Sequence, residues 1–117
     1  MTPSNFSFPP PPLEAVLDGE LQLRVFRSML TARTLENKLS SLYKGGKIVG
    51  GVYLGTGQEA LSASLGASLI KGRDCFSPLI RDQAGRTAFG EDMLDATRTH
   101  LGSARGPMRG RDGNIHR

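Results

Sequence analysis

The sequence has 117 residues, with 15 Lys and Arg against 11 Asp and Glu (net charge +4) and 38% hydrophobic residues. This length suits one small domain, and the composition is too apolar for a disordered tail and too charged for a membrane protein. The single cysteine, Cys75, excludes a disulfide within the chain and argues against a cysteine-based zinc site. Because no targeting pattern precedes Arg24, we expect a cytoplasmic protein.

Residues 1–17 are predicted to form a Pro-rich N-terminal tail, since five of the seven prolines lie between Pro3 and Pro12. A run of prolines donates no backbone hydrogen bonds and adopts polyproline II. The run is either a ligand for another protein module or a stiff leader to the first helix. The absence of a flanking basic residue favours the leader.

A long helix is predicted from Asp18, a candidate N-cap, to about Tyr43, before two consecutive glycines. One face carries apolar residues at helical spacing, and Leu23, Phe26 and Leu30 point to the other side. A helix of about 25 residues with two apolar faces is buried or packs on a partner. We therefore expect Leu23, Phe26 and Leu30 to be exposed in so short a chain.

A second helix is predicted after a Gly-rich stretch, residues 46–57, because Thr56 and Glu59 have the spacing of a capping box. The helix is expected to end near Lys71 and, being uncharged and rich in small residues from Ala60 to Ile70, to be deeply buried.

The run Gly55–Ala60 also matches a variant of the dinucleotide-binding fingerprint. That fingerprint needs an acidic residue at the end of the next strand, whereas Asp74 precedes the next predicted strand. A nicotinamide or flavin site is therefore disfavoured.

Residues 75–80 are predicted to form a short buried strand, a helix follows to about Phe89, and Asp92 caps a last helix that ends at Leu101. Arg81 then falls between a strand and a helix N-terminus, where open α/β sheets bind ligands. Its guanidinium and free backbone N–H groups would form an anion site. The alternative is a surface arginine paired with Asp82 or another carboxylate.

Residues 102–117 form a Gly- and Arg-rich loop without hydrophobic periodicity. Three interpretations fit this loop: a segment that binds nucleic acid, a loop that binds phosphate or carboxylate groups, or a solvated tail. The absence of aromatic residues disfavours nucleic acid. His100 and His116 are too far apart for a recognisable metal-ligand pattern, and no nucleophile–base pair identifies catalytic residues.

Three motifs in order resemble those of one family: Gly55-Thr-Gly-Gln-Glu-Ala60, Arg81-Asp82, and Arg109-Gly-Arg-Asp-Gly-Asn-Ile-His116. They are similar to the alpha subunit of the decarboxylating component of thiamine-diphosphate-dependent 2-oxo acid dehydrogenases, such as the pyruvate, branched-chain 2-oxo acid and acetoin enzymes. The similarity covers about residues 20–117. Residues 18–117 are thereby identified as the N-terminal part of the thiamine-diphosphate-binding domain, truncated before its Mg²⁺-binding motif.

The resemblance implies an α/β, three-layer fold that is mostly helical in this segment, with one or two short strands. It implies oxidative decarboxylation with thiamine diphosphate and Mg²⁺, followed by acyl transfer to a lipoyl carrier. The implied partners are a beta subunit, in a heterotetramer, and a lipoyl-bearing acyltransferase, with no membrane. The alternative function is that of a small basic helical protein that binds nucleic acid or an acidic partner.

The resemblance also implies site residues. Ile80 and Arg81 occupy the positions of the family's diphosphate-binding Tyr-Arg pair, and the tyrosine hydroxyl is lost at Ile80. Tyr53 and His116 are expected at the substrate channel. Tyr53 stands where pyruvate-type members often have a histidine, so the substrate could be a branched-chain or another 2-oxo acid in place of pyruvate. The family's Gly-Asp-Gly…Asn metal motif is not in these residues, so no metal ligand is assigned and the chain alone is expected to be inactive.

Overall fold

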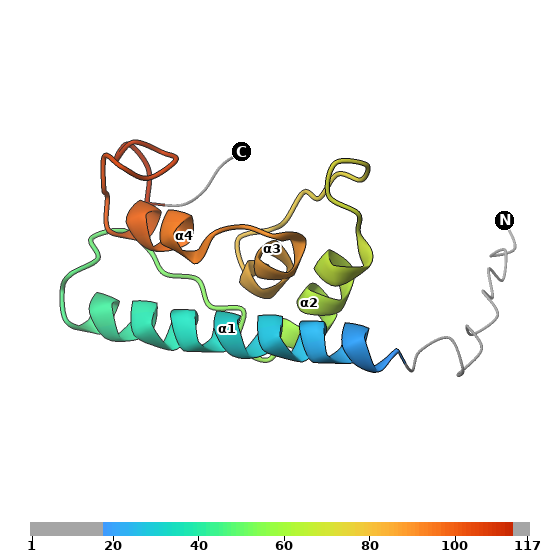
Figure 1. Cartoon of the computed structure of the whole chain (residues 1–117). Coiled ribbons are helices and arrows are strands. Elements are labelled where there is room, and N and C mark those ends of the chain that lie inside the picture. The colour runs from blue at the N-terminus through green and yellow to red at the C-terminus, as the bar shows by residue number, and fades with distance from the viewer. Residues whose placement is uncertain (1–17, 114–117) are drawn as a thin grey trace, which may run out of the picture.

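The computed structural model describes residues 18–113, which form four helices: α1 (Gly19–Lys44), α2 (Glu59–Ser68), α3 (Gln83–Phe89) and α4 (Met93–His100). The long α1 runs along one side, and the three short helices pack across it (Figure 1). Within this part, no helix is long and apolar enough to cross a bilayer. The predicted tail, residues 1–17, and His116 lie outside the described residues.

Helix α1 begins and ends where the sequence predicts. The Asp18 carboxylate accepts a hydrogen bond from the Glu20 N–H at 3.1 Å, and the Gly45 N–H caps the other end. Leu23, Phe26 and Leu30 are 50%, 58% and 56% exposed, which confirms the expected second apolar face. An exposed stripe of this kind is typical of a surface that other residues cover.

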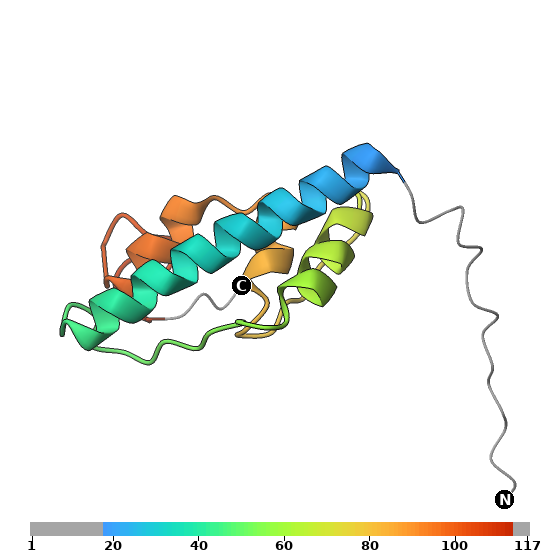
Figure 2. The same cartoon turned by 90° about the horizontal axis from the view of Figure 1, so that it is seen from below.

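The opposite face of α1 carries two small clusters of buried residues. Ala32 packs with Ala63 of α2 and Ala84 of α3. Towards the C-terminal end of α1, Leu35 and Leu39 pack with Ile48 and with Ala96 of α4. Figure 2 shows α2 and α4 beside opposite halves of α1. The cores are thin because alanine supplies much of the contact.

Helix α2 does not use the predicted capping box. It begins at Glu59, and its N-cap residue, Gln58, makes no side-chain cap bond. The Glu59 carboxylate binds Arg33 of α1 and the Gly57 N–H at 2.7 Å. A charge-assisted bond to arginine is stronger than a neutral cap bond, so Glu59 is held towards α1. The helix also ends at Ser68, earlier than predicted.

The predicted burial of α2 applies to one face only. Ser62 and Gly66 are buried against α3, whereas Leu61 and Leu65 are 79% and 52% exposed. A Cβ atom at Gly66 would lie 2.2 Å from the Gly85 carbonyl oxygen, and the Gly85 N–H donates to Ser62 Oγ at 2.9 Å. The small residues therefore allow the backbones of α2 and α3 to touch.

The predicted strand at residues 75–80 is wrong. The described residues, 18–113, form no strand. Their β-type pairing is an isolated bridge between Lys71 and Asp74. A strand needs a neighbour for its backbone groups, and Pro78 has no N–H to offer one. The Leu79 N–H instead donates to the Asp82 carboxylate at 2.7 Å. The described residues are mostly helical, as expected, and the α/β class is not seen in them.

Candidate functional site

A cavity of about 190 Å³ lies between α1, the extended stretch before α2 and the loop before α3. Tyr53 and Ile80, which are 27 residues apart in the sequence, both line it. The cavity therefore joins two of the predicted site residues, one expected at the substrate channel and the other at the cofactor.

Arg81 lies next to this cavity, with its guanidinium carbon 5.6 Å from the centre of the Tyr53 ring. Such a cation–π contact contributes about 0.5–1 kcal/mol at an exposed site. Within residues 18–113, Arg81 forms no ion pair, and the Asp82 carboxylate binds the Leu79 N–H instead. The charge of Arg81 is thus available to an anion beside Tyr53.

Gly55 joins the segments that carry Tyr53 and Arg81. Its N–H donates to Glu36 Oε1 at 2.8 Å. A Cβ atom at position 55 would lie 2.2 Å from the Arg81 carbonyl oxygen. The loop can approach the Arg81 backbone only because glycine has no side chain. This contact sets Tyr53 against Arg81.

Glu36 is a site residue that the sequence analysis missed. Its side chain lines the cavity, and only 3% of the residue is exposed. Burial raises the pKa of Glu36, and the Gly55 N–H, the Thr56 hydroxyl and Arg33 oppose this shift. The second oxygen, Oε2, is buried without a hydrogen-bond partner. The sequence did contain one signal for Glu36: it is an acidic residue that directly follows Leu35, on the apolar side of α1.

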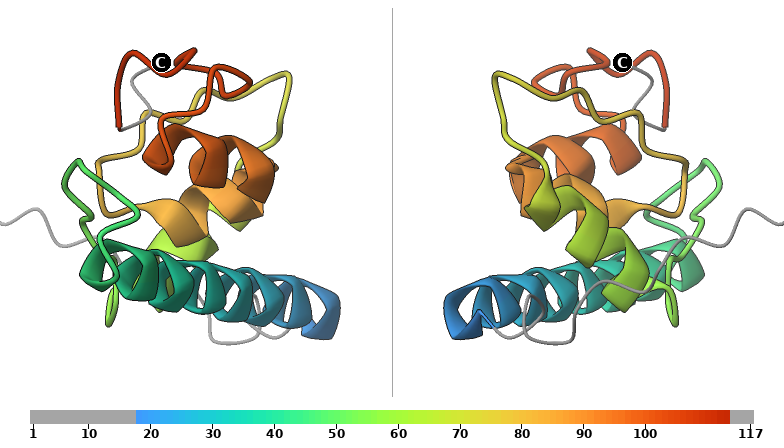
Figure 3. Two further views of the ribbon diagram at one scale, coloured as in Figure 1. Left: turned by 90° about the vertical axis from the view of Figure 1, so that its left-hand side faces the viewer. Right: turned by 90° about the vertical axis from the view of Figure 1, so that its right-hand side faces the viewer.

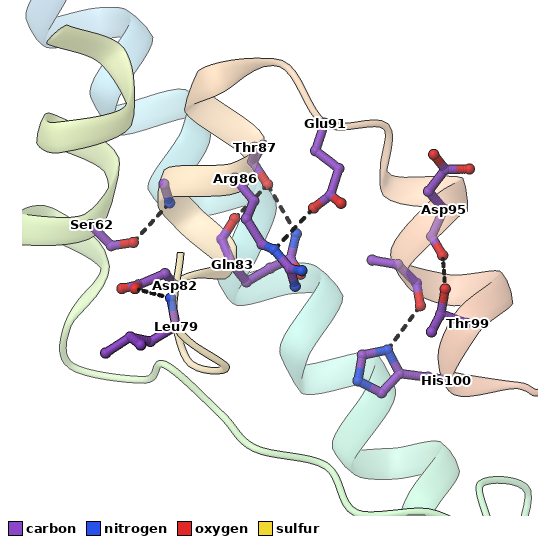
Figure 4. A network of polar contacts seen from close by, with 12 residues as sticks. Ser62, Leu79, Asp82, Gln83, Arg86, Thr87, Glu91, Asp95, Thr99 and His100 are labelled. Atoms are coloured by element: carbon purple, nitrogen blue, oxygen red, sulfur yellow. Dashed lines mark hydrogen bonds and ion pairs between the residues drawn. The ribbon is translucent and has the colours of Figure 1, made fainter. Parts of the chain in front are cut away.

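Three other polar side chains that line the cavity each have a partner within α3, α4 or the turn between them (Figure 4). Arg86 Nε lies 3.5 Å from Glu91 Oε2, and Gln83 Nε2 donates to Thr87 Oγ1 at 3.3 Å. His100 Nδ1 lies 2.8 Å from the backbone carbonyl four residues earlier. Gln83, Arg86 and His100 therefore give the cavity wall a polar part.

Residues 102–113 of the Gly/Arg-rich loop lie on the side of α4 that faces away from α1 (Figure 3). Arg111 and Lys47 line a second cavity of about 200 Å³ there, and His100 lines both cavities. Of the described arginines of this loop, Arg105, Arg109 and Arg111, none lines the cavity of Tyr53 and Ile80.

Beside the site, the buried Glu59 forms an ion pair with Arg33, which is partly exposed to solvent. The hydrogen bond from Arg33 is the main cause that lowers the pKa of Glu59 to about 2. Glu59 is buried, whereas the Arg33 side chain is 46% exposed. Solvent around Arg33 screens the pair, so its contribution to stability is smaller than the pKa shift alone suggests.

We expect acid to weaken the fold through Glu59. A carboxyl whose pKa is lower in the folded state stabilises above its unfolded pKa and loses that effect as the pH falls through the folded pKa. Between pH 4.5 and 2 the free energy of unfolding should fall by about 1–2 kcal/mol more in the parent than in Glu59→Gln. Urea titrations at several pH values measure this difference. Equal acid sensitivity of the two proteins would show that the pair contributes nothing.

Arg81 and the residues around it fit an anionic group, because Arg81 is exposed and forms no ion pair with a carboxylate of residues 18–113. They do not form a metal site: in the part of the chain that the structure describes, no three His, Cys, Asp or Glu side chains gather to hold a metal ion.

Sequence comparisons identify relatives among pyruvate dehydrogenase E1 component alpha subunits. The Zymomonas mobilis protein is 34% identical over 96% of this chain, the chloroplastic alpha-3 protein of Oryza sativa 28% over 97%, and the mitochondrial protein of Solanum tuberosum 31% over 91%. The chain spans 32%, 27% and 27% of their lengths. No family model matches the chain, and no solved structure does. The resemblance predicted from the three motifs is confirmed.

Proposed function

Because the chain is similar to pyruvate dehydrogenase E1 component alpha subunits, of which it spans about 27–32%, we propose that it is part of the alpha subunit of a 2-oxo acid dehydrogenase. This oxidoreductase decarboxylates a 2-oxo acid and transfers the acyl group to a lipoyl carrier. Its partners are a beta subunit and a lipoyl-bearing acyltransferase. The observation that carries the proposal is the cavity lined by Tyr53 and Ile80, with the Arg81 guanidinium over the Tyr53 ring.

Arg81 would hold the diphosphate of thiamine diphosphate beside Tyr53, next to this cavity. A guanidinium offers phosphate two parallel N–H donors, and the Tyr53 ring restricts its orientation. Ile80 adds apolar contact but no hydrogen-bond donor. When bound, the cofactor supplies the nucleophilic carbon for decarboxylation, and the protein binds and orients it.

The Mg²⁺ that accompanies the diphosphate is proposed to take its ligands from other parts of the alpha subunit. The described residues contain no acidic cluster for it. For the same reason we expect no turnover of a 2-oxo acid by the 117-residue chain alone.

Tyr53 is proposed to contact the 2-oxo acid from the cavity wall. The relatives are named for pyruvate, but Tyr53 stands where pyruvate-type members often carry histidine. The proposal therefore specifies the class of 2-oxo acids without a particular side chain. The cytoplasmic location stays a prediction.

Calorimetric titration distinguishes this function from nucleic-acid binding. Thiamine diphosphate should give a saturable heat with the 117-residue chain, and a 20-nucleotide RNA should not. A basic nucleic-acid-binding protein would show the reverse, with RNA affinity that falls steeply as salt is raised. That result would favour the alternative of a small basic binding protein.

A further inference from the structure

A third cavity, of about 480 Å³, lies between the turn at Lys71, residues 76–78 and the turn that joins α3 to α4. It shares Pro78 and Arg86 with the smaller cavity of the candidate site. Its volume falls within the roughly 300–1,000 Å³ that is usual for binding pockets. Because Lys71 and Asp92 are exposed parts of its lining, a molecule can reach it from solvent.

Two phenylalanine rings form an apolar wall of this third cavity. The ring centroids of Phe76 and Phe89 lie 5.7 Å apart, with the ring planes tilted by 57°. Both residues line the cavity and are half-buried, so the protein covers only part of each. Pro78 continues the apolar surface beside them. An apolar wall of this kind favours an aromatic or aliphatic group of a binding partner.

The charged residues of the lining are two cations and three carboxylates: Lys71, Arg86, Glu91, Asp92 and Asp95. Arg86 pairs with Glu91 at 3.5 Å, and Lys71 Nζ donates to a backbone carbonyl at 3.3 Å. Asp92 and Asp95 are the N-cap and a first-turn residue of α4, three positions apart and therefore on one side of the helix. A cationic group complements this side of the cavity.

Asp92 is well placed to bind such a cation. Its Oδ1 accepts a hydrogen bond from the Leu94 N–H at 2.9 Å, which caps α4. Within residues 18–113, Asp92 forms no ion pair. Since a carboxylate has several acceptor sites, its second oxygen can accept a charge-assisted bond from lysine or arginine while the cap stays in place.

We propose that the third cavity docks a peptide segment of a partner protein, with an aromatic side chain against Phe76 and Phe89 and a neighbouring lysine or arginine at Asp92. A segment fits better than a free small molecule, because none of the lining residues is buried, whereas small-molecule sites bury about 70–90% of their ligand. Neither Tyr53 nor Arg81 lines this cavity, so the docking is independent of cofactor binding.

A hexapeptide of sequence Gly-Gly-Phe-Lys-Gly-Gly, acetylated and amidated at its ends, serves as the probe. Two further peptides replace its phenylalanine by alanine or its lysine by glutamate, and phenylethylamine represents a free amine with the same ring. Calorimetric titration gives their affinities for the 117-residue chain, and amide NMR spectra locate the bound peptide.

Asp92→Asn removes the charge at the cavity but keeps the start of α4, because asparagine and aspartate are similarly good N-caps. Asp18→Asn is the matched control. Asp18 also caps a helix, α1, through its side chain, and it lines none of the three cavities. Circular dichroism melts verify that both variants fold.

The phenylalanine–lysine peptide should bind and shift the amide signals of residues 89–95. Alanine in place of its phenylalanine should weaken binding about 10-fold, because the contact with the two rings is lost. Glutamate in place of its lysine should abolish binding, since two carboxylates would then face each other. Asp92→Asn should weaken binding of the phenylalanine–lysine peptide about 2- to 5-fold, and Asp18→Asn should match the parent.

Equal affinities of the phenylalanine–lysine and alanine–lysine peptides would overturn the docking, as would an unchanged affinity in Asp92→Asn. Equal weakening by Asp92→Asn and Asp18→Asn would also overturn it, since the peptide would then respond only to net charge. If phenylethylamine binds as tightly as the peptide, the cavity is a site for small amines and the peptide proposal fails.

Discussion

Gly66→Ala should destabilise the protein by about 2 kcal/mol. The added Cβ would lie 2.2 Å from the Gly85 carbonyl oxygen and 2.9 Å from Gly85 Cα. Both are backbone atoms of α3, so α2 and α3 have to move apart. Overpacking typically costs about 1–3 kcal/mol and occasionally more, and the better helix propensity of alanine offsets only about 1 kcal/mol. Urea denaturation followed by circular dichroism measures the change.

Gly19→Ala is the control for this substitution. Gly19 is also helical, but a Cβ atom there meets nothing within 4 Å. Its denaturation midpoint should stay the same or rise slightly. A midpoint for Gly66→Ala at or above that of the parent would show that α2 and α3 do not pack backbone to backbone.

Arg81→Ala should weaken thiamine diphosphate binding by about 10- to 150-fold. This range follows from the loss of a charge-assisted contact to phosphate, which is worth about 1.5–3 kcal/mol. Arg81→Lys should recover only part of the loss, because lysine keeps the charge without the planar pair of donors. Ile80→Tyr should tighten binding modestly by adding a hydroxyl donor. Calorimetric titrations of the three variants give these affinities.

Arg105→Ala is a suitable control for Arg81→Ala, since both arginines are exposed but the structure places Arg81 over the Tyr53 ring. It should bind the cofactor like the parent. If Arg81→Ala and Arg105→Ala behave alike, Arg81 is an ordinary surface arginine, and the cofactor assignment fails with it.

The helices predicted best are those whose signals are local. Asp18 and Asp92 were both predicted to be N-caps, and each carboxylate accepts a backbone N–H two residues later. The capping box at Thr56 failed because Glu59 has a partner 26 residues away, Arg33. Residues 75–80 have a strand-like composition, but a strand also depends on a neighbouring strand, which local sequence does not specify.

The candidate site was predicted in part. The resemblance pointed to Tyr53, Ile80 and Arg81 separately, and the fold brings them together. Periodicity could not identify Glu36, because its role depends on a hydrogen bond to Gly55, 19 residues away. The glycine that allows this approach was noticed only as part of a fingerprint for a different class of cofactor.

Hydrogen–deuterium exchange with and without thiamine diphosphate tests the central claim most directly, because it locates the bound cofactor on the chain. The account predicts slower exchange in residues 52–57 and 79–83, which carry Tyr53, Ile80 and Arg81, and no change in the first turns of α1. Protection confined to the Gly/Arg-rich loop at residues 102–113, or no protection at saturating cofactor, would contradict it.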